Sequence, residues 1–150
     1  MSKKILIIGK NSNIAKKFIK KISKSSLLAP DKKNWNMLDS DFKKSQIKEI
    51  INSDKILLLQ STISSKDFLK RHHQDIVDQF TINFLSVVKI CEIALNNNKN
   101  VRIIILGSES GVKGSFDIIY GLMKSAIHKY VEERRIKFPK QQLVCVAPST

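Results

Sequence analysis

The sequence has 150 residues, of which 42% are hydrophobic, and its 27 lysines and arginines outnumber 13 acidic residues to give a formal net charge of +14. This length suits a single domain with a real core, and no apolar run approaches the roughly 18 residues of a membrane-spanning helix or forms an N-terminal secretory segment. We therefore expect a cytoplasmic protein with no membrane partner, in which residues 1–150 form one domain.

The first predicted element is a strand over residues 3–8, because a short continuous apolar run before a glycine is typical of a strand buried on both faces of a parallel sheet. A helix should follow over residues 13–24, where apolar residues recur at helical spacing. The turn from Gly9 to Ala15 would aim helix N–H groups at a phosphate. Its candidate nucleotide-binding residues are Gly9, Asn11, Ser12, Asn13 and Ile14. With one glycine of the fingerprint's three, a plain strand-to-helix turn is an equally open interpretation.

Two short strands are predicted next, over residues 26–29 and 34–37, with no room for a helix between them. Asp31 lies 22 residues after the glycine of the first turn, about where an acid would hold the ribose 2′-hydroxyl of NAD. Lys32 and Lys33 could instead hold the 2′-phosphate of NADP. A plain solvated turn explains these residues equally well, so the choice between the two cofactors stays open.

The rest of the chain alternates helices and strands. Amphipathic patterns predict helices over residues 41–52, 66–97 (in one or two pieces) and 115–135, and apolar runs predict strands over residues 56–59, 101–106 and 143–147. This alternation predicts a Rossmann-like α/β fold, a three-layer, doubly wound parallel sheet with right-handed crossovers. Ligands in such folds bind at the carboxyl ends of the strands. Gly9, Gln60 and Ser108 all follow predicted strands, so we expect them at one edge of the sheet.

Tyr120 and Lys124 lie four residues apart in the last predicted helix, so they share one face of it. A nearby ammonium lowers the pKa of a phenol, which would suit Tyr120 to general acid and base catalysis near neutral pH. Ser108, at the end of the preceding strand, could polarise a substrate carbonyl, and Ser110 is a second candidate for that role. The alternative is a surface tyrosine and lysine on an ordinary helix, since short motifs are often fortuitous.

The remaining reactive and charged residues indicate no further site. Cys91 and Cys145 fall in predicted apolar elements and are interpreted as small buried hydrophobes rather than as a disulfide. In Arg71-His72-His73 the adjacent histidines would point in different directions on a helix, so we expect a solvated helix end and no metal. The lysines are scattered, without an aromatic platform or a recognition-helix signature. We expect a solvated basic surface, with nucleic-acid binding as the less favoured alternative.

Taken together and in order, these residues resemble the short-chain dehydrogenase/reductase family over nearly all of the chain. Gly9 to Ala15 stands where the family has its Gly-x-x-x-Gly-x-Gly turn, and Gln60 to Thr62 stands where it has Asn-Asn-Ala-Gly. Ser108, Tyr120 and Lys124 match the catalytic trio. The remaining matches are Asp39, after the family's third strand and facing the adenine, Asn83, the central-helix asparagine of the proton relay, and Pro148, in the corner after the last strand.

The chain departs from the family's pattern at several of these positions. Asn13 and Ala15 replace two family glycines, the asparagine-rich segment is changed, and Ser149 replaces the glycine of the corner. The chain also ends at Thr150, whereas family members usually continue with a last strand and a mobile substrate loop. We therefore expect a Rossmann-like domain without the usual C-terminal part, either as a fragment of a longer protein or as a shortened member of the family.

The resemblance implies an NAD- or NADP-dependent oxidoreductase that interconverts a carbonyl and an alcohol by hydride transfer. The catalytic candidates are Ser108, Asn83, Tyr120 and Lys124. The cofactor-binding candidates are Gly9, Asn11, Ser12, Asn13, Ile14, Asp39, Gln60, Ser61, Tyr120, Lys124 and Pro148, together with Asp31 from its spacing after the first turn. It also implies a small carbonyl or alcohol substrate and a homodimer or homotetramer. The alternatives are a non-catalytic nucleotide-binding or regulatory protein of the same fold, and a basic nucleic-acid-binding domain.

Overall fold

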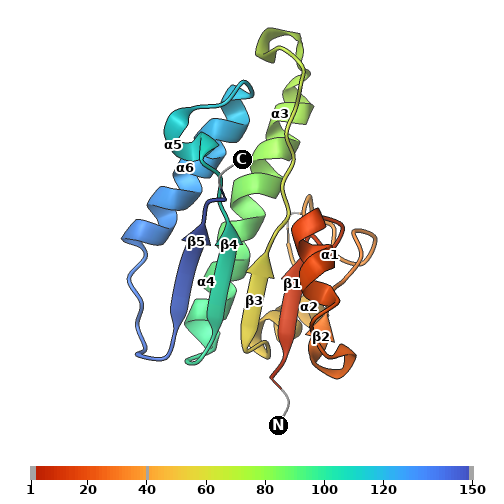
Figure 1. Cartoon of the computed structure of the whole chain (residues 1–150), viewed down its shortest axis with the longest axis vertical. Helices are drawn as coiled ribbons and strands as arrows, with labels where there is room; N and C mark the ends of the chain where they lie inside the picture. The colour runs from red at the N-terminus through yellow and green to blue at the C-terminus, as the bar shows by residue number, and fades with distance from the viewer. Residues whose placement is uncertain (1–2, 40, 149–150) are drawn as a thin grey trace.

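The structure, a computed structural model, describes residues 3–39 and 41–148. Its parallel strands form one five-stranded sheet in the order β2-β1-β3-β4-β5 (Figure 1). The strands are β1 (Ile5–Ile8), β2 (Leu27–Leu28), β3 (Lys55–Leu58), β4 (Arg102–Leu106) and β5 (Gln142–Val146). This all-parallel sheet confirms the Rossmann-like α/β fold predicted from the alternation of strands and helices.

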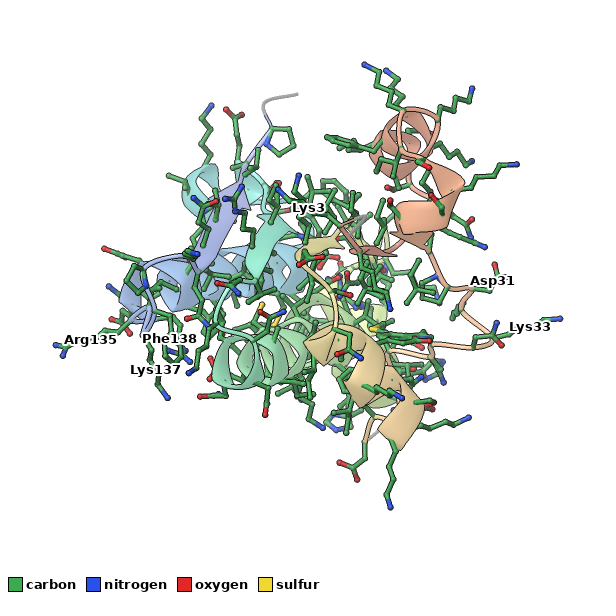
Figure 2. The ribbon with its side chains drawn as sticks, turned by 90° about the horizontal axis from the view of Figure 1, so that it is seen from below. Lys3, Asp31, Lys33, Arg135, Lys137 and Phe138 are labelled. Atoms are coloured by element: carbon green, nitrogen blue, oxygen red, sulfur yellow. The ribbon has the colours of Figure 1, made fainter. Side chains whose placement is uncertain are left out.

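Helices cover both faces of the sheet, which Figure 2 shows from below. They are α1 (Asn13–Ile19), α2 (Lys44–Ile51), α3 (His73–Phe80), α4 (Ser86–Asn97), α5 (Ser110–Lys113) and α6 (Ile118–Glu133). On one face, Ala15 of α1 packs with Ile7 and Leu57 of the sheet. On the other face, residues of α2, α4 and α6 share a single cluster with the opposite side chains of the strands. The molecule therefore has the three predicted layers.

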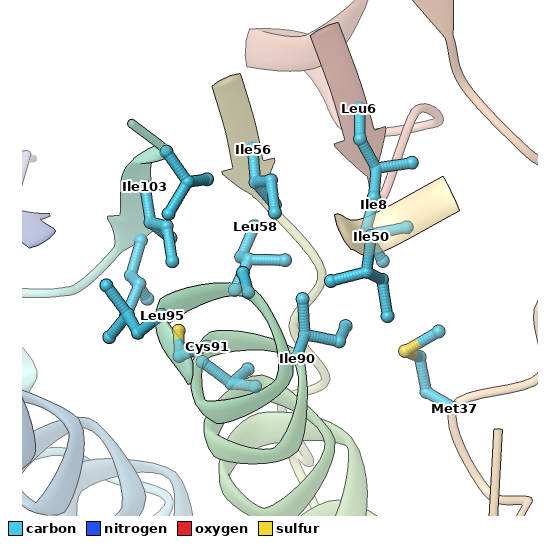
Figure 3. Packing of buried hydrophobic residues seen from close by; sticks show 14 of the residues in the cluster. Leu6, Ile8, Met37, Ile50, Ile56, Leu58, Ile90, Cys91, Leu95 and Ile103 are labelled. Atoms are coloured by element: carbon cyan, nitrogen blue, oxygen red, sulfur yellow. The ribbon is translucent and has the colours of Figure 1, made fainter. Parts of the chain in front are cut away.

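The larger core lies between the sheet and α4. Along each strand alternate side chains face opposite ways, and Ile56 and Leu58 of β3 point toward Ile90 and Cys91 of α4 (Figure 3). Cys91 is fully buried in this core, as its apolar surroundings in the sequence predict. Among the residues that the structure describes, no helix has both the length and the apolar character needed to cross a membrane.

The strand predicted over residues 34–37 is wrong, because this segment forms turns rather than a sixth strand. The backbone N–H groups of Asn34 and Trp35 both donate to the carbonyl of Asp31, and the Asn34 carbonyl accepts a hydrogen bond from the side chain of Gln46 in α2. These groups are therefore satisfied without a neighbouring strand. Trp35 and Met37 are buried in the core as strand residues would be, but they enter it from a loop.

Two helix boundaries differ from the expected ones. The helix predicted over residues 13–24 ends at Ile19. Beyond it the N–H groups of Lys21 and Ile22 donate to carbonyls three residues back, so the chain tightens into turns. The stretch predicted over residues 66–97 becomes continuously helical only from His73, and a π-helical turn over Thr81–Leu85 joins α3 to α4. The short helix α5 was not predicted, since four residues are too few to show a helical pattern.

Candidate active site

The carboxyl ends of β1, β3 and β4 bring three predicted residues to one edge of the sheet. Gly9 directly follows β1, Gln60 lies two residues beyond β3, and Ser108 lies two residues beyond β4. These three strands are neighbours in the sheet and run parallel. Their ends therefore form one rim, where the ligand sites of doubly wound folds lie.

Lys124 reaches this rim from α6. Its side chain is buried, with the residue 2% exposed, and its Nζ donates a hydrogen bond of 2.7 Å to the carbonyl oxygen of Leu106, the last residue of β4. The same Nζ lies 5.5 Å from the ring centre of Tyr120, which is half-buried one helical turn earlier. The structure thus brings Tyr120 and Lys124 together beside the strand end that leads into Ser108. This is the arrangement that the spacing of the two residues predicts.

Burial lowers the pKa of Lys124 to about 8, whereas a lysine in an unfolded chain titrates near 10.4. Between these values the unfolded chain binds more protons than the folded one, so the free energy of unfolding should rise as the pH goes from about 8 to 10. The full difference amounts to about 3 kcal/mol. Urea denaturation at several pH values should show this rise in the wild type, and the difference between wild type and Lys124→Met isolates it from other titrating groups. Parallel curves for the two proteins would contradict a buried ammonium.

Ser108 and Ser110 occupy different places in the turn between β4 and α6. Ser108 Oγ accepts a hydrogen bond of 3.2 Å from the backbone N–H of Ser110, which begins α5. Helix α5 rests directly on α6, because a Cβ at Gly111 would come within 2.9 Å of the Lys124 carbonyl carbon. The turn carrying Ser108 is therefore tied closely to the helix that carries Tyr120 and Lys124.

Asn83 lies in the π-helical turn and is buried. Its side-chain amide makes two hydrogen bonds with the backbone of Thr62: Nδ2 donates to the Thr62 oxygen at 2.7 Å, and Oδ1 accepts from the Thr62 nitrogen at 2.8 Å. π-Helical turns are frequent at functional sites. Here the turn directs Asn83 at the segment after β3 and fixes that segment against the central helix, while its part in a proton relay stays a prediction.

A buried ion pair beside Tyr120 was missed by the sequence analysis. Arg71 Nη1 lies 3.2 Å from Asp117 Oδ1, with side-chain exposures of 3% and 1%. Gln79 Nε2 donates to Asp117 Oδ2 at 2.6 Å, and Gln79 Oε1 accepts from Arg71 Nη2. Asp117 also accepts backbone hydrogen bonds from Ser64 and from Tyr120, so it caps the start of α6 three residues before the tyrosine. The network joins the segment after β3 to the start of α6.

This network corrects the expectation of a solvated helix end at Arg71-His72-His73. The two histidines are exposed as expected, but Arg71 turns inward to Asp117. Burial alone would raise the pKa of Asp117, yet its hydrogen bonds and the charge of Arg71 outweigh that effect and lower the pKa below its usual range. The partners are 46 residues apart, so no local pattern in the sequence could have paired them.

A cavity of about 300 Å³ opens beside the Gly9 turn at the same rim of the sheet. The predicted cofactor residues that line it are Gly9, Asn11, Ser12, Gln60 and Ser61. Two lysines also line it: Lys32, a predicted candidate for the 2′-phosphate of NADP, and Lys10, which was not predicted. The side-chain nitrogen and oxygen of Gln60 are both buried without a hydrogen-bond partner among the described residues. A buried amide in that state is suited to a polar ligand.

Gly9 shapes the cavity floor. Its φ of +88° is a left-handed conformation that glycine adopts easily, and a Cβ there would lie 2.4 Å from the backbone nitrogen of Gln60. The next turn is held by Ser12, whose Oγ accepts a hydrogen bond of 3.1 Å from the Ala15 nitrogen at the start of α1. The glycine therefore allows the first turn to lie against the segment after β3.

The other predicted residues lie outside the cavity lining. Asn13 is exposed on α1, and Ile14 packs against the smaller core. Asp31 forms an ion pair of 2.5 Å with Lys10, and Asp39 accepts a hydrogen bond of 3.1 Å from Asn36. Pro148 is exposed after β5, and the neighbouring Ser149 lies outside the described residues.

The structure of this chain is similar to several solved structures. No family model matches the chain, and no curated protein matches it in sequence. A short-chain dehydrogenase/reductase of the glucose/ribitol dehydrogenase type from Brucella melitensis superposes with a TM-score of 0.75 at 17% identity, covering 98% of this chain and 72% of the other. A 4-hydroxyisoleucine dehydrogenase, solved with NADH and succinate, gives 0.70 at 18% identity, covering 86% and 70%.

A third solved structure, a short-chain dehydrogenase from Sphingobium yanoikuyae in complex with NADPH, gives a TM-score of 0.69 at 14% identity, covering 87% of this chain and 63% of that one. The protein therefore shares the fold of short-chain dehydrogenases/reductases, in agreement with the resemblance in sequence. The neighbours include complexes with both nicotinamide cofactors. At sequence identities of 14–18%, the similarity to these three structures shows a shared fold.

Proposed function

We propose that the protein is an NAD(P)-dependent oxidoreductase that interconverts a carbonyl and an alcohol. The observation that carries this proposal is the placement of Lys124, a buried ammonium bonded to the end of β4 and lying beside the ring of Tyr120. An ordinary surface helix has no reason to bury a lysine without an acidic partner, because burying a charge is costly. Functional sites commonly contain such perturbed groups.

In this mechanism each residue has one task. Tyr120 gives its phenolic proton to the carbonyl oxygen during reduction and takes it back during oxidation. Lys124, still mostly protonated at neutral pH, favours the phenolate that remains. Ser108 donates a hydrogen bond to the substrate oxygen and stabilises the charge that develops there. A bound nicotinamide supplies or accepts the hydride.

The residues around the Gly9 cavity fit a nicotinamide dinucleotide. The unpartnered amide of Gln60 offers both a donor and an acceptor to a nucleotide, and Gly9 keeps the floor free of side-chain atoms. Gly9, Asn11, Ser12, Gln60 and Ser61 would hold the cofactor. We further propose a preference for NADP, because Lys32 lines the cavity and the Asp31 carboxylate, which could hold a ribose 2′-hydroxyl, is paired with Lys10.

Thermal unfolding with each cofactor tests the proposal. NADPH at about 100 times its dissociation constant should stabilise the fold by roughly 2.7 kcal/mol, and NADH at the same concentration should stabilise it less. Gly9→Ala should remove the effect, because the new Cβ would displace the backbone of Gln60. Gly114→Ala is the matched control: it adds a Cβ at a similar positive φ of +91° where nothing lies within 4 Å, so it should keep the ligand-dependent shift. A well-folded wild type that neither cofactor stabilises would contradict the proposal.

A second candidate is a nucleotide-binding protein of the same fold without catalysis. The replacement of two family glycines by Asn13 and Ala15 favours it, and Ala15 is fully buried against the sheet. Saturable cofactor binding without turnover on a broad panel of carbonyl compounds would support this candidate. Both candidates are proposed to act in the cytoplasm, where the two free cysteines would stay reduced.

We also propose a homo-oligomer. Large apolar side chains on α5, on α6 and in the turn between them face solvent, with Val112 and Phe116 about four-fifths exposed and Leu122 more than half exposed. Exposed apolar groups of this size favour burial against another surface. Light scattering after size-exclusion chromatography measures the state directly, and a monomer at micromolar concentration would contradict this part of the proposal.

A further inference from the structure

A second cavity, of about 260 Å³, lies at the opposite edge of the sheet from the proposed cofactor site. It is lined by Lys3, Asp54, Lys55, Asn100, Arg102 and Lys140. Lys55 and Arg102 are the first residues of β3 and β4, so the cavity lies where the strands begin. Figure 2 looks at the molecule from this end, with Lys3 labelled. The length of the strands separates this cavity from Gly9 and Gln60, and the proposed cofactor cannot occupy both.

The charge of this cavity is unbalanced. Four cationic side chains line it, against the single carboxylate of Asp54, which accepts a hydrogen bond of 2.8 Å from the backbone N–H of Lys4. Within residues 3–39 and 41–148, none of these four cations takes part in an ion pair. The cavity therefore presents positive charge that the described part of the protein does not neutralise.

Two of these cations are held side by side by the sheet itself. Lys55 and Arg102 are partners in the register of β3 and β4, so their strands lie about 4.8 Å apart and their side chains leave the same face. Like charges directly opposite each other on adjacent strands are destabilising. An anion between the two side chains would remove this repulsion, and the guanidinium of Arg102 has the planar donor geometry that matches a phosphate.

We propose that this cavity binds a phosphate group of a small anionic ligand. Lys55 is half-buried, Arg102, Lys3 and Lys140 are exposed around it, and Asn100 adds a neutral polar group. The volume is close to the lower limit of small-molecule sites, which hold roughly 300–1,000 Å³. A single strand of nucleic acid is the less suitable source of the phosphate, because no aromatic residue lines the cavity for a base to stack on.

Isothermal titration with inorganic diphosphate, at constant ionic strength, tests this site independently of the proposed oxidoreductase function. The wild type should bind diphosphate saturably at a site that depends on Lys55 and Arg102. Any binding at the proposed cofactor cavity is identified separately, because Gly9→Ala should remove it. Lys55→Gln combined with Arg102→Gln should weaken binding at least about tenfold, or by about 1.4 kcal/mol, because the charge-assisted hydrogen bonds from both side chains to the phosphate are lost. The matched control is Lys16→Gln with Lys17→Gln, which removes two charges from the exposed side of α1 and should change the affinity less than about threefold.

Equal weakening in both double variants would overturn the proposal, because it would show attraction to net charge alone. So would the absence of saturable binding by the wild type. If a single-stranded RNA oligonucleotide binds more tightly than diphosphate, and its binding depends on Lys55 and Arg102, the ligand is a nucleic acid and the proposed small ligand is wrong. Since Lys55 is partly buried, Lys140→Gln at the exposed rim provides a second variant that should also weaken diphosphate binding if the first does not fold.

Discussion

Replacing Tyr120 by phenylalanine should lower turnover by about 10²–10⁴-fold, the usual contribution of a positioned proton donor, while stabilisation by the cofactor stays close to that of the wild type. The substitution removes only the phenolic oxygen. The backbone N–H of Tyr120 still donates to Asp117, so the start of α6 keeps its cap. Lys124 keeps its bond to Leu106 and stays beside the ring. The measurement is steady-state reduction of the carbonyl compound that the wild type converts fastest.

A matched substitution on the same helix controls for general effects. Tyr130 lies near the far end of α6, where its hydroxyl donates a hydrogen bond of 2.6 Å to Glu92. Tyr130→Phe should therefore reduce stability slightly and leave turnover nearly unchanged. If Tyr120→Phe retains wild-type turnover while Tyr130→Phe behaves as expected, the proton donor must be another group and the proposed mechanism is lost.

The sheet could be predicted from the sequence because its signals are local. The central strands are short apolar runs, each followed by small or polar residues, and burial on both faces leaves such runs without polar alternation. The placement of Gly9, Gln60 and Ser108 at one rim then follows from the parallel order of the strands. The proximity of Tyr120 and Lys124 could also be predicted, because residues four positions apart lie on the same face of a helix.

What could not be predicted depends on contacts between distant segments. Trp35 and Met37 are two residues apart and both buried, as in a strand. In the fold, however, the Asn34 carbonyl accepts a hydrogen bond from Gln46 of α2 and not from a neighbouring strand. In the sequence, Arg71 is a basic residue near a helix start and Asp117 is a common type of helix cap. Neither residue indicates that the two form a buried ion pair. The polar network beside Tyr120 arises only when the fold brings these segments together.

Replacing Arg71 by leucine should lower the free energy of unfolding by about 3–5 kcal/mol, the usual result of breaking a buried ion pair from one side. Asp117 would stay buried with its hydrogen bonds from Gln79, Ser64 and Tyr120 but without a neutralising charge. Urea denaturation at pH 7 and 25 °C measures the change. The same loss should loosen the segment after β3, which Gln79 also holds through the Thr62 carbonyl.

The pH dependence and a control pair separate the buried ion pair from general effects. Because the pKa of Asp117 is lowered in the folded protein, its contribution is present above the pKa of an unfolded aspartate, near 3.9, and is lost as the pH falls through the lower folded value. Arg71→Leu should weaken that dependence, and Asp117→Asn in the same background should recover part of the stability. Lys129→Met removes a cation that lies between two exposed carboxylates on α6, and its effect on stability should be far smaller than that of Arg71→Leu. A loss of that small size in Arg71→Leu would mean that water screens the Asp117 charge, and that the network does not hold the start of α6.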